Sequence, residues 1–400
     1  MARLPLRYSI RNLFRRRTRT LLTTIGLALV VSALVFVLAF SNSMAATFRE
    51  TGDPDNMIII SKKAATFVLS SISDQDCELI QNKLYDDAVM ITTKGTWGET
   101  EVPLISKEAY IGLNVEVKGV EKFRSGAQRG VIHGIDPSIG LALNNHVKII
   151  DGRLPRKGMR ELMVGKLAGT RIGVEQDDLS IGRELYFLNK SWTVVGIFEA
   201  AGTISESELW THEHDLRLYL KRQDYSFIKI KLKDPSRMAE LCDQLSTDEQ
   251  FGVKAFPEQE YFADYAEGFD FFRQFAHALA MIIVVGGVVA GMNTMYTAVM
   301  GRVREIGTLQ VIGFSKRAVL MGIMTESLLI TFTAGVLGCG LGFLANGLPI
   351  KIPMAAFRVE VETTVIAWAL GATVMIGLIG AFMPAYRALR LRMVDAVRYQ

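Results

Sequence analysis

Two histidines are the clearest candidates in this chain for residues that bind a metal ion or take part in catalysis. His212 and His214 stand beside Glu213 and Asp215, and imidazoles and carboxylates at this spacing could bind a metal ion. Two lone imidazoles on a polar segment are more typical of a solvated surface, and neither HExxH, GxSxG nor a pair of CxxC steps occurs in the sequence. We therefore expect no catalytic residue and no metal site.

A second group of residues fits an enzyme pattern only in part. Ser226 and Lys229 have SxxK spacing, but they fall at the start of an alternating strand, so chance explains the match better. Gly165-Lys166 is followed by Leu and lacks the upstream glycine of the GxxxxGK[ST] loop that holds nucleotide phosphates. The chain is therefore predicted to bind no cofactor of its own.

The three cysteines leave one question open. Cys339 lies in an apolar run, whereas Cys77 and Cys242 lie in two segments with helical spacing in a water-soluble region. These two segments could be neighbours in space, and an extracytoplasmic compartment permits disulfides. A Cys77–Cys242 bridge therefore remains an open alternative.

The elements that must carry these residues are set by hydrophobicity. Half of the 400 residues are hydrophobic, which indicates a membrane protein. Four runs without a charged residue are each longer than the roughly 20 residues that a spanning helix needs. They are Thr20 to Phe48, Gln274 to Gly301, Ser327 to Ile350 and Thr363 to Tyr386. The predicted fold class is an α-helical membrane protein with four transmembrane helices and a large α+β extracytoplasmic domain.

The orientation of the spans follows from the basic residues beside them. Residues 1–20 hold seven arginines and no acid, the loop 302–317 holds four basic residues and one acid, and the tail from Arg387 holds four arginines and one aspartate. The positive-inside rule places all three in the cytoplasm. Residues 41–274 then lie outside with 28 basic and 36 acidic residues, so the overall net charge of +4 does not indicate nucleic-acid binding.

These observations predict nine segments. They are a cytoplasmic amphipathic helix at 1–19, transmembrane helix 1 at 20–42, an extracytoplasmic α+β domain at 43–274 with a β-rich insertion at about 130–215 and a stalk at about 258–274, transmembrane helix 2 at 275–300, a cytoplasmic coupling loop at 301–317, transmembrane helix 3 at 318–346, a short outer loop at 347–362, transmembrane helix 4 at 363–386 and a cytoplasmic tail at 387–400. A cleaved signal peptide is the alternative for the first run, but this run is longer than a typical signal core.

The outer region has signals of both helices and strands. Residues 56–61 resemble a strand, and residues 73–87 and 234–245 resemble capped helices. Residues 227–233 alternate strictly, so we expect three isoleucine or leucine side chains on one face and three lysines on the other. Residues 257–274 lack an obvious breaker and are predicted to form a stalk helix that continues into the second span.

The spans carry small residues that allow helices to approach closely. The predicted packing glycines are Gly287, Gly291, Gly335, Gly338 and Gly342. Glu326 lies near the start of the third span, where a charge in contact with lipid would be costly. We expect it to be buried against another helix near the membrane interface, with proton coupling as the weaker alternative.

The segment 302–317 is the strongest functional candidate. It places charged residues around an apolar middle, with glycines that allow the backbone to turn. A short helix there could pass force between a cytoplasmic partner and the spans on either side. The alternative is a basic linker whose charges only fix the topology.

This arrangement resembles the MacB/FtsX-like permeases, the membrane subunits of type VII ABC transporters, with LolC/LolE- and MacB-related members. The resemblance covers essentially the whole chain. It rests on the topology and on Arg304 to Gly313 (REIGTLQVIG), Glu326-Ser327-Leu328-Leu329, Arg11-Asn12-Leu13 and Asp151-Gly152-Arg153. The resemblance implies that 302–317 is the coupling helix. It assigns ATPase coupling to Arg302, Arg304, Glu305, Ile306, Gly307, Leu309 and Gly313.

The same resemblance implies partners and a function. It implies an ABC ATPase dimer that holds ATP and Mg, since this chain resembles the stand-alone permease form, and a second permease copy, identical or paralogous. A periplasmic adaptor or carrier protein is a further expected partner. The implied function is to convert ATP hydrolysis into movement of the outer domain, driving export or extraction of a lipoprotein, lipid, drug or peptide at the inner membrane. The alternative is a signalling permease that activates an extracytoplasmic hydrolase.

Overall fold

The structure is a computed structural model that describes residues 17–95, 98–120, 129–352 and 355–389. Most of the predicted amphipathic helix at 1–19 and of the tail at 387–400 lies outside these ranges. The described residues form two compact units. One holds the apolar helices, and the other comprises residues 44–270 together with 349–358. Each unit is described separately below.

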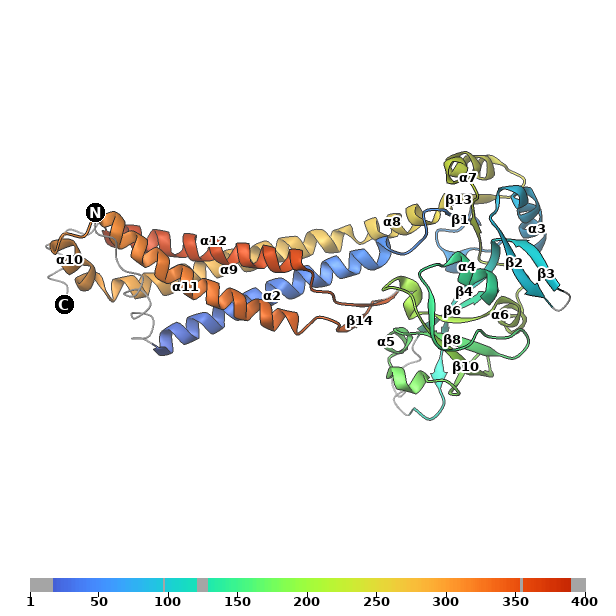
Figure 1. Cartoon of the computed structure of the whole chain (residues 1–400), viewed down its shortest axis with the longest axis horizontal. Coiled ribbons are helices and arrows are strands. Elements are labelled where there is room, and N and C mark those ends of the chain that lie inside the picture. Colours follow the sequence, from blue (N-terminus) through green and yellow to red (C-terminus); the bar gives the residue numbers. More distant parts are fainter. Residues whose placement is uncertain (1–16, 96–97, 121–128, 353–354, 390–400) are drawn as a thin grey trace. The chain divides into compact units, whose positions relative to one another are not determined.

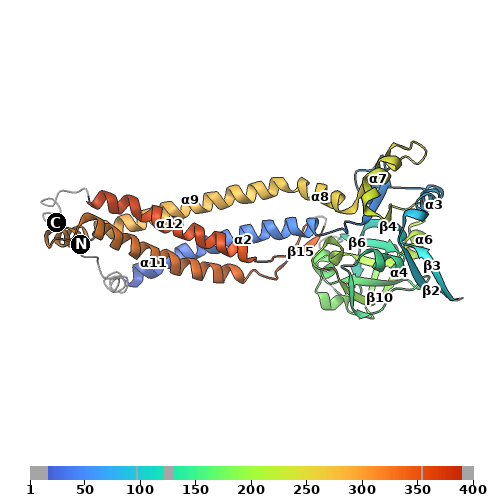
Figure 2. The ribbon, with the colours of Figure 1, turned by 45° about the horizontal axis from the view of Figure 1, so that its top comes forward.

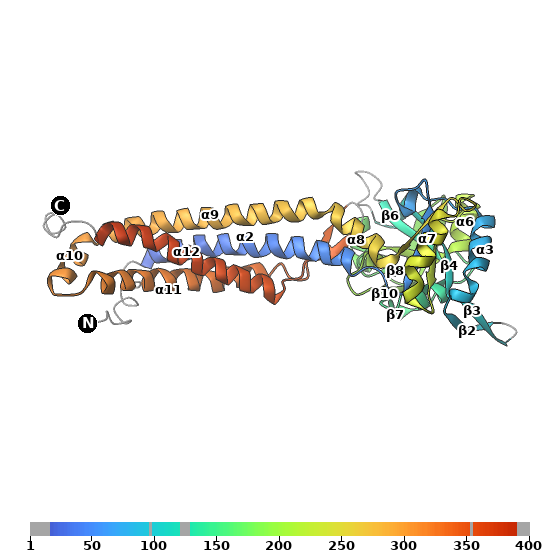
Figure 3. The ribbon, with the colours of Figure 1, turned by 90° about the horizontal axis from the view of Figure 1, so that it is seen from above.

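The membrane unit consists of long helices that run beside one another (Figure 1; Figure 3). Its elements are α2 (Arg17–Arg49), α9 (Asp270–Met300), α10 (Val303–Val311), α11 (Lys316–Phe343) and α12 (Thr363–Leu389). In the described part of the chain, four of these helices have the length and hydropathy to cross a membrane, whereas α10 is too short. The prediction of four spans in an α-helical membrane protein is therefore confirmed.

Small residues determine how these helices pack. A Cβ atom added at Gly287 would lie 2.9 Å from the Ile376 side chain of α12, and one at Gly335 would lie 2.8 Å from Thr373 Oγ1. Such distances are shorter than packed side chains allow, so the backbones can approach only because these positions are glycines. Ser327 adds a polar contact, since its Oγ donates to the Gly377 carbonyl at 2.9 Å.

The outer unit is built on one long mixed sheet with helices packed against it (Figure 2). The strand order is β13-β1-β12-β4-β6-β11-β8-β10-β9-β5, and β7 pairs with β10. The strands are β1 (Asn56–Ser61), β4 (Ile105–Asn114), β5 (Glu116–Val117), β6 (Arg129–Ile135), β7 (Lys148–Gly152), β8 (Glu161–Gly165), β9 (Glu184–Phe187), β10 (Lys190–Glu199), β11 (Leu209–His212), β12 (Phe227–Lys231) and β13 (Val253–Pro257). The outer helices are α3 (Asp74–Lys83), α4 (Pro137–Leu143), α5 (Ala168–Ile172), α6 (Glu213–Leu220), α7 (Met238–Thr247) and α8 (Glu258–Gly268).

Strand β4 joins the two halves of this sheet. Its first residues, Ile105 to Glu108, pair with β12, and its later residues, Ala109 to Asn114, pair with β6. The structure thus differs from the predicted insertion at about 130–215. The half of the sheet that contains β6 begins within β4, and β4 also pairs with β12 of the other half. A strand of ten residues is long enough to serve two partners in sequence.

The structure corrects one further prediction and adds detail to another. The stalk is not one continuous helix, since α8 ends at Gly268 and α9 begins at Asp270, and glycine is a poor helix former. The outer loop also contains a hairpin of β14 (Pro349–Lys351) and β15 (Ala356–Arg358). This hairpin packs against α5 and the short 3₁₀ helix η5 (Ile204–Ser207), with Phe357 fully buried. A separate hairpin of β2 (Met90–Gly95) and β3 (Gly98–Pro103) completes the unit.

The cysteines answer the question left open by the sequence. Cys77 and Cys242 are both free thiols, as is Cys339, and all three are buried. Cys77 and Cys242 belong to the same apolar core beneath α3 and α7. Burial raises the pKa of the Cys77 thiol to about 12 and that of the Cys242 thiol to about 11, so neither is a reactive thiolate at neutral pH.

Candidate functional site

The candidate coupling site is α10 with the turn that follows it. The buried side chains of α10 recur at helical spacing, at Val303, Ile306 and Gly307. Ile306 packs with Val299 of α9, Val319 of α11 and the end of α12. Because its apolar side is held by three membrane helices, α10 is a firm platform for its exposed side.

The exposed side of α10 combines charged and apolar groups. Arg304, Glu305 and Thr308 are exposed, and just beyond them Val311 and Ile312 have 67% and 70% of their surface open. Large apolar side chains beside charged ones are typical of a protein-binding surface. We call these five residues the coupling surface.

The turn after α10 has a specific backbone requirement. Gly313 has φ of +104°, a conformation that side chains other than glycine rarely adopt. Ser315 then begins α11, with its Oγ accepting the Ala318 N–H at 3.2 Å. The chain can therefore reverse between the two helices within four residues.

An ion pair fixes the start of α10. Arg302, the N-cap residue, donates from Nη1 to both carboxylate oxygens of Glu326 at 2.8 and 3.1 Å. Both side chains are only 13% exposed. Glu326 lies in α11, so this pair joins the first residue of the coupling segment to the third span. The sequence indicated that Glu326 is buried against another helix, but not that Arg302 would be its partner.

The structure divides the predicted coupling residues into two roles. Arg304 and Glu305 lie on the coupling surface, whereas Ile306, Gly307 and Leu309 face the membrane helices. Arg302 and Gly313 hold the ends of the segment. Val311 and Ile312 were not predicted as site residues. The signal that could have identified them is a pair of apolar residues just before Gly313, the glycine that follows α10.

The predicted packing glycines lie at helix contacts. Besides Gly287 and Gly335, Gly291 faces Ile376 of α12. Gly338 and Gly342 lie against Val31 and Val35 of α2, where an added Cβ would come within 2.6 and 2.7 Å of those side chains.

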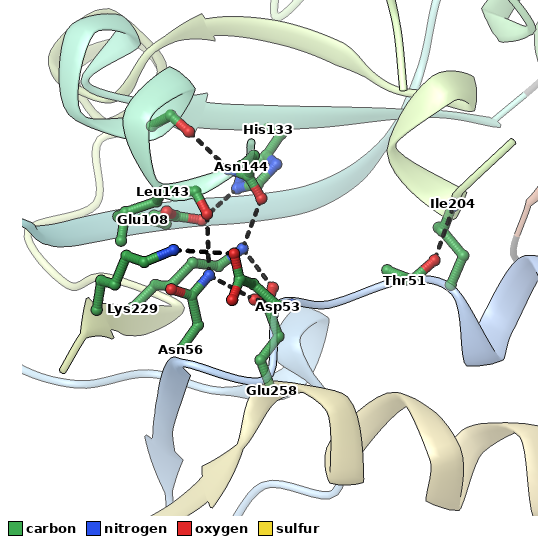
Figure 4. Close-up of polar contacts among 12 residues, drawn as sticks. Thr51, Asp53, Asn56, Glu108, His133, Leu143, Asn144, Ile204, Lys229 and Glu258 are labelled. Atoms are coloured by element: carbon green, nitrogen blue, oxygen red, sulfur yellow. Dashed lines mark hydrogen bonds and ion pairs between the residues drawn. The ribbon is translucent and has the colours of Figure 1, made fainter. Parts of the chain in front are cut away.

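The outer unit contains a buried charged cluster that the sequence did not reveal, and Figure 4 shows two of its members, Glu108 and His133. His133 of β6 lies with Nε2 2.6 Å from Glu108 and Nδ1 3.0 Å from Glu208. Tyr110 and Trp210 each donate to Glu208 at 2.8 Å. Burial alone would lower the pKa of His133, but the two carboxylates raise it to about 9. We call Glu108, His133 and Glu208 the histidine cluster.

A second buried ion pair lies nearby on β12. Lys229 Nζ is 2.5 Å from Glu258 Oε1, and their side chains are 6% and 2% exposed. The three lysines of residues 227–233 were predicted on one face of the strand, and of these Lys229 is buried, Lys231 is half-buried and Lys233 is exposed. The sequence signal for this pair is a lysine flanked by isoleucines inside a strand. If both faces of the sheet are covered, such a lysine needs a buried acid as its partner.

The candidates for chemistry have structural roles instead. His212 is buried, contrary to the predicted solvated surface, because it caps α6 and lies 2.5 Å from Glu213. His214 is exposed. Ser226 Oγ accepts the Tyr110 N–H at 2.9 Å, and Lys229 is engaged by Glu258, so the SxxK pair has no free base. Within the described ranges, no group of three or more potential ligands is placed to hold a metal ion.

Comparison with known proteins now adds to this geometry. Residues 20–247 match the MacB-like periplasmic core domain, and residues 278–393 match the FtsX-like permease C-terminal domain. The macrolide export ATP-binding/permease protein MacB of Neisseria gonorrhoeae is 21% identical over 98% of this chain, and the chain spans 60% of that protein's length. An uncharacterized ABC transporter permease, YvrN of Bacillus subtilis, is 36% identical over 27% of this chain and 26% of its own.

Solved structures also align with part of this chain. The periplasmic region of MacB from Actinobacillus actinomycetemcomitans aligns over 53% of this chain and 92% of its own, with 11% identity and a TM-score of 0.37. The sequence-family matches carry the assignment, because they cover both the outer unit and the three later spans. The chain belongs to the MacB/FtsX-like permeases of ABC transporters.

Proposed function

We propose that this chain is the permease subunit of an ABC transporter and works by mechanotransmission. A separate ATPase subunit binds the coupling surface, and its ATP-driven movement shifts the membrane helices and, through them, the outer domain. The observation that carries this proposal is the coupling surface itself. Val311 and Ile312 are exposed beside Arg304 and Glu305, on a helix whose other side is held by α9, α11 and α12.

The geometry gives a physical path for the force. A push on α10 reaches α11 through the Arg302–Glu326 ion pair and through the packing of Ile306. A charge-assisted contact from one guanidinium nitrogen to both carboxylate oxygens, with little solvent contact, holds the two helices together at this point. The coupling surface therefore moves together with the third span rather than as a free loop.

The partners follow from this role. ATP and Mg are held by the ATPase dimer, and the permease acts with a second copy, identical or paralogous. The basic loop at 302–317 is placed in the cytoplasm, both termini with it, and the outer domain in the periplasmic or extracytoplasmic space.

The substrate is proposed to be taken up on the outer side and exported or extracted from there, with an adaptor or carrier protein assisting. Relatives named as macrolide export proteins make a macrolide drug the first substrate to test, followed by lipoprotein, lipid and peptide. No observation in the outer unit favours the signalling alternative, in which the same movement activates a hydrolase.

Two substitutions in α10 test the proposal: a charge reversal on the coupling surface (Glu305→Arg) and added bulk at Gly307, which is buried against the membrane helices (Gly307→Trp). Glu305→Arg and Gly307→Trp are compared with wild type in proteoliposomes that contain the ATPase subunit purified with the chain. Both variants should insert normally but lose most of the permease-stimulated ATP hydrolysis. Arg358→Glu, a charge reversal at an exposed residue of the outer unit, is the control and should keep it. Full stimulation by Glu305→Arg and Gly307→Trp would refute the coupling role.

Topology is tested separately. Ser315→Cys and Gly202→Cys variants are labelled in intact cells with a membrane-impermeant maleimide. Only the Gly202→Cys chain should react. Reaction of both, or of Ser315→Cys alone, would overturn the proposed orientation.

A further inference from the structure

One buried carboxylate lies where two membrane-connected helices meet the outer sheet. Glu258 is the first residue of α8, the helix that precedes α9, and it is 2% exposed. Its Oε2 accepts the Asp53 N–H at 3.1 Å, and Asp53 follows the end of α2 by four residues. Glu258 therefore ties the segment that leaves the first span helix to the start of the helix that leads to the second.

The backbone confirms how close this approach is. Gly52 has φ of +104°, and a Cβ there would lie 3.0 Å from Glu258 Cγ and 3.2 Å from the Gln259 nitrogen. A larger residue would be strained and would push the two segments apart. The contact between the two segments is thus built into the chain at both Gly52 and Glu258.

The same carboxylate also binds the sheet. Asn56 of β1 donates from Nδ2 to Glu258 Oε2 at 2.7 Å, and Lys229 Nζ of β12 lies 2.5 Å from Glu258 Oε1 (Figure 4). Lys229 in turn donates to Asn144 Oδ1 at 2.9 Å, at the end of α4. We call Glu258, Lys229, Asn56 and Asn144 the clamp. It joins the two membrane-connected segments to strands β1 and β12 and to helix α4.

A buried ion pair is a costly way to gain stability. Two desolvated charges gain little net free energy over apolar residues of the same size, but they hold a defined geometry, and removing one partner leaves an unpaired charge. Burial alone would lower the pKa of Lys229, yet the carboxylates of Glu258 and Glu108 raise it, so the ammonium stays charged. The pair is therefore suited to fixing position.

We propose that the clamp is the point at which movement of the first and second span helices is transferred to the outer domain. This inference rests on the proposed function and deepens it, because it assigns the transfer step to named positioning residues. The outer domain follows the helices because Glu258, at the start of α8, is bonded to the segment that leaves α2 and to the sheet. Loss of the Lys229–Glu258 link leaves the helices free to move without carrying the sheet.

The decisive variant is Glu258→Gln combined with Lys229→Met. It removes both charges, so no buried ion is left unpaired, and the glutamine can still accept from Asp53 and Asn56. A purely structural role predicts full recovery of function in this double variant relative to the singles. A positioning role predicts that the fold recovers but the transfer of movement does not.

Movement is measured without knowing the substrate. Spin labels at Asn82→Cys, exposed on α3, and Thr364→Cys, exposed at the start of α12, report the distance between the outer domain and the membrane helices. The three native cysteines are buried. The full chain, reconstituted with its ATPase, is compared without nucleotide and with ATP plus orthovanadate, and ATP hydrolysis and the thermal midpoint are recorded on the same samples.

The expected result separates transfer from folding. Wild type shows a nucleotide-dependent distance change, and the Glu258→Gln/Lys229→Met variant shows one reduced about fivefold, with ATP hydrolysis within about twofold of wild type. The matched control is Lys83→Met/Asp248→Asn, which removes a partly exposed ion pair of the same domain and should keep the full change.

Two failures can be told apart. A wild-type distance change in the Glu258→Gln/Lys229→Met variant would overturn the clamp and leave the proposed function standing. The absence of any change in wild type, with active hydrolysis, would overturn the proposed function and this inference with it.

Discussion

Arg302 and Glu326 form a two-bond ion pair, with one guanidinium nitrogen 2.8 and 3.1 Å from the two carboxylate oxygens. The pair joins the N-cap of α10 to a point ten residues into α11, and its side chains have little contact with solvent. It is the polar bond by which the coupling segment holds the third span. Its loss should be felt in both stability and coupling.

A double-mutant cycle measures that bond. Arg302→Met and Glu326→Gln should each lower the stability of the chain in detergent by about 3 kcal/mol, because each leaves a largely buried charge without its partner. The double variant should cost less than the sum of the two, with a coupling free energy above about 1 kcal/mol. The same cycle at exposed Lys316 with Glu326 should show none. Additive single effects would exclude a direct pair.

The exposed apolar residues of the coupling surface should contribute to partner binding. Val311→Ser and Ile312→Ser should each weaken binding of the ATPase subunit by about 1.5–3 kcal/mol if they are fully covered in the complex. Surface plasmon resonance of the nanodisc-embedded chain would measure the dissociation constant. Leu69→Ser alters a side chain of the outer unit that is 72% exposed and should leave the constant unchanged. Unchanged binding by both coupling-surface variants would place the partner elsewhere.

The sequence predicted the membrane helices well because their signal is local. A run of about 20 apolar residues has to form a helix in lipid, where no water satisfies the backbone. The short helix at α10 follows similarly from the turn at Gly313 and the apolar spacing before it. Even so, the stalk was predicted as continuous, although α8 ends at Gly268 and Phe269 separates it from α9.

The outer sheet could be predicted only in pieces because its pairing is not local. Nothing in residues 105–114 shows that one strand pairs first with β12 and then with β6. Buried charges were also missed, since a lysine such as Lys229 is usually exposed, and its burial depends on Glu258, which is 29 residues away in the chain. The same holds for His133, whose partners come from β4 and from the residue before β11.

Two glycines of α11 provide a matched test of helix packing. An added Cβ at Gly338 would lie 2.6 Å from both the Ala28 carbonyl oxygen and Val31 Cβ, whereas one at Gly340 would meet no atom within 4 Å. Gly338→Ala should therefore destabilise the chain by about 1–3 kcal/mol, since α2 must shift. Gly340→Ala should be neutral or slightly stabilising, because alanine favours helix. Thermal unfolding in detergent measures both, and equal midpoints would contradict the observed α2–α11 contact.

The histidine cluster should make the stability of the outer unit depend on pH. The pKa of His133 is raised to about 9, so its contribution is complete below the unfolded value of 6.5 and is lost as the pH rises through 9. Burial would raise the pKa of Glu208, but His133 lowers it to about 2, so that contribution is complete above 4.5 and is lost as the pH falls. The stability of the outer unit should be greatest between pH 4.5 and 6.5. It should fall by about 3 kcal/mol as the pH rises from 6.5 to 9.

Substitution of the histidine separates this effect from other titrations. Trp210 donates to Glu208 at 2.8 Å, so its fluorescence reports unfolding next to the cluster. His133→Gln should lower the unfolding midpoint at pH 6 and remove most of the further fall between pH 6.5 and 9, because the neutral amide has no proton to lose. His214→Gln, at an exposed histidine, should retain the wild-type profile. A wild-type alkaline slope in His133→Gln would show that another group titrates there.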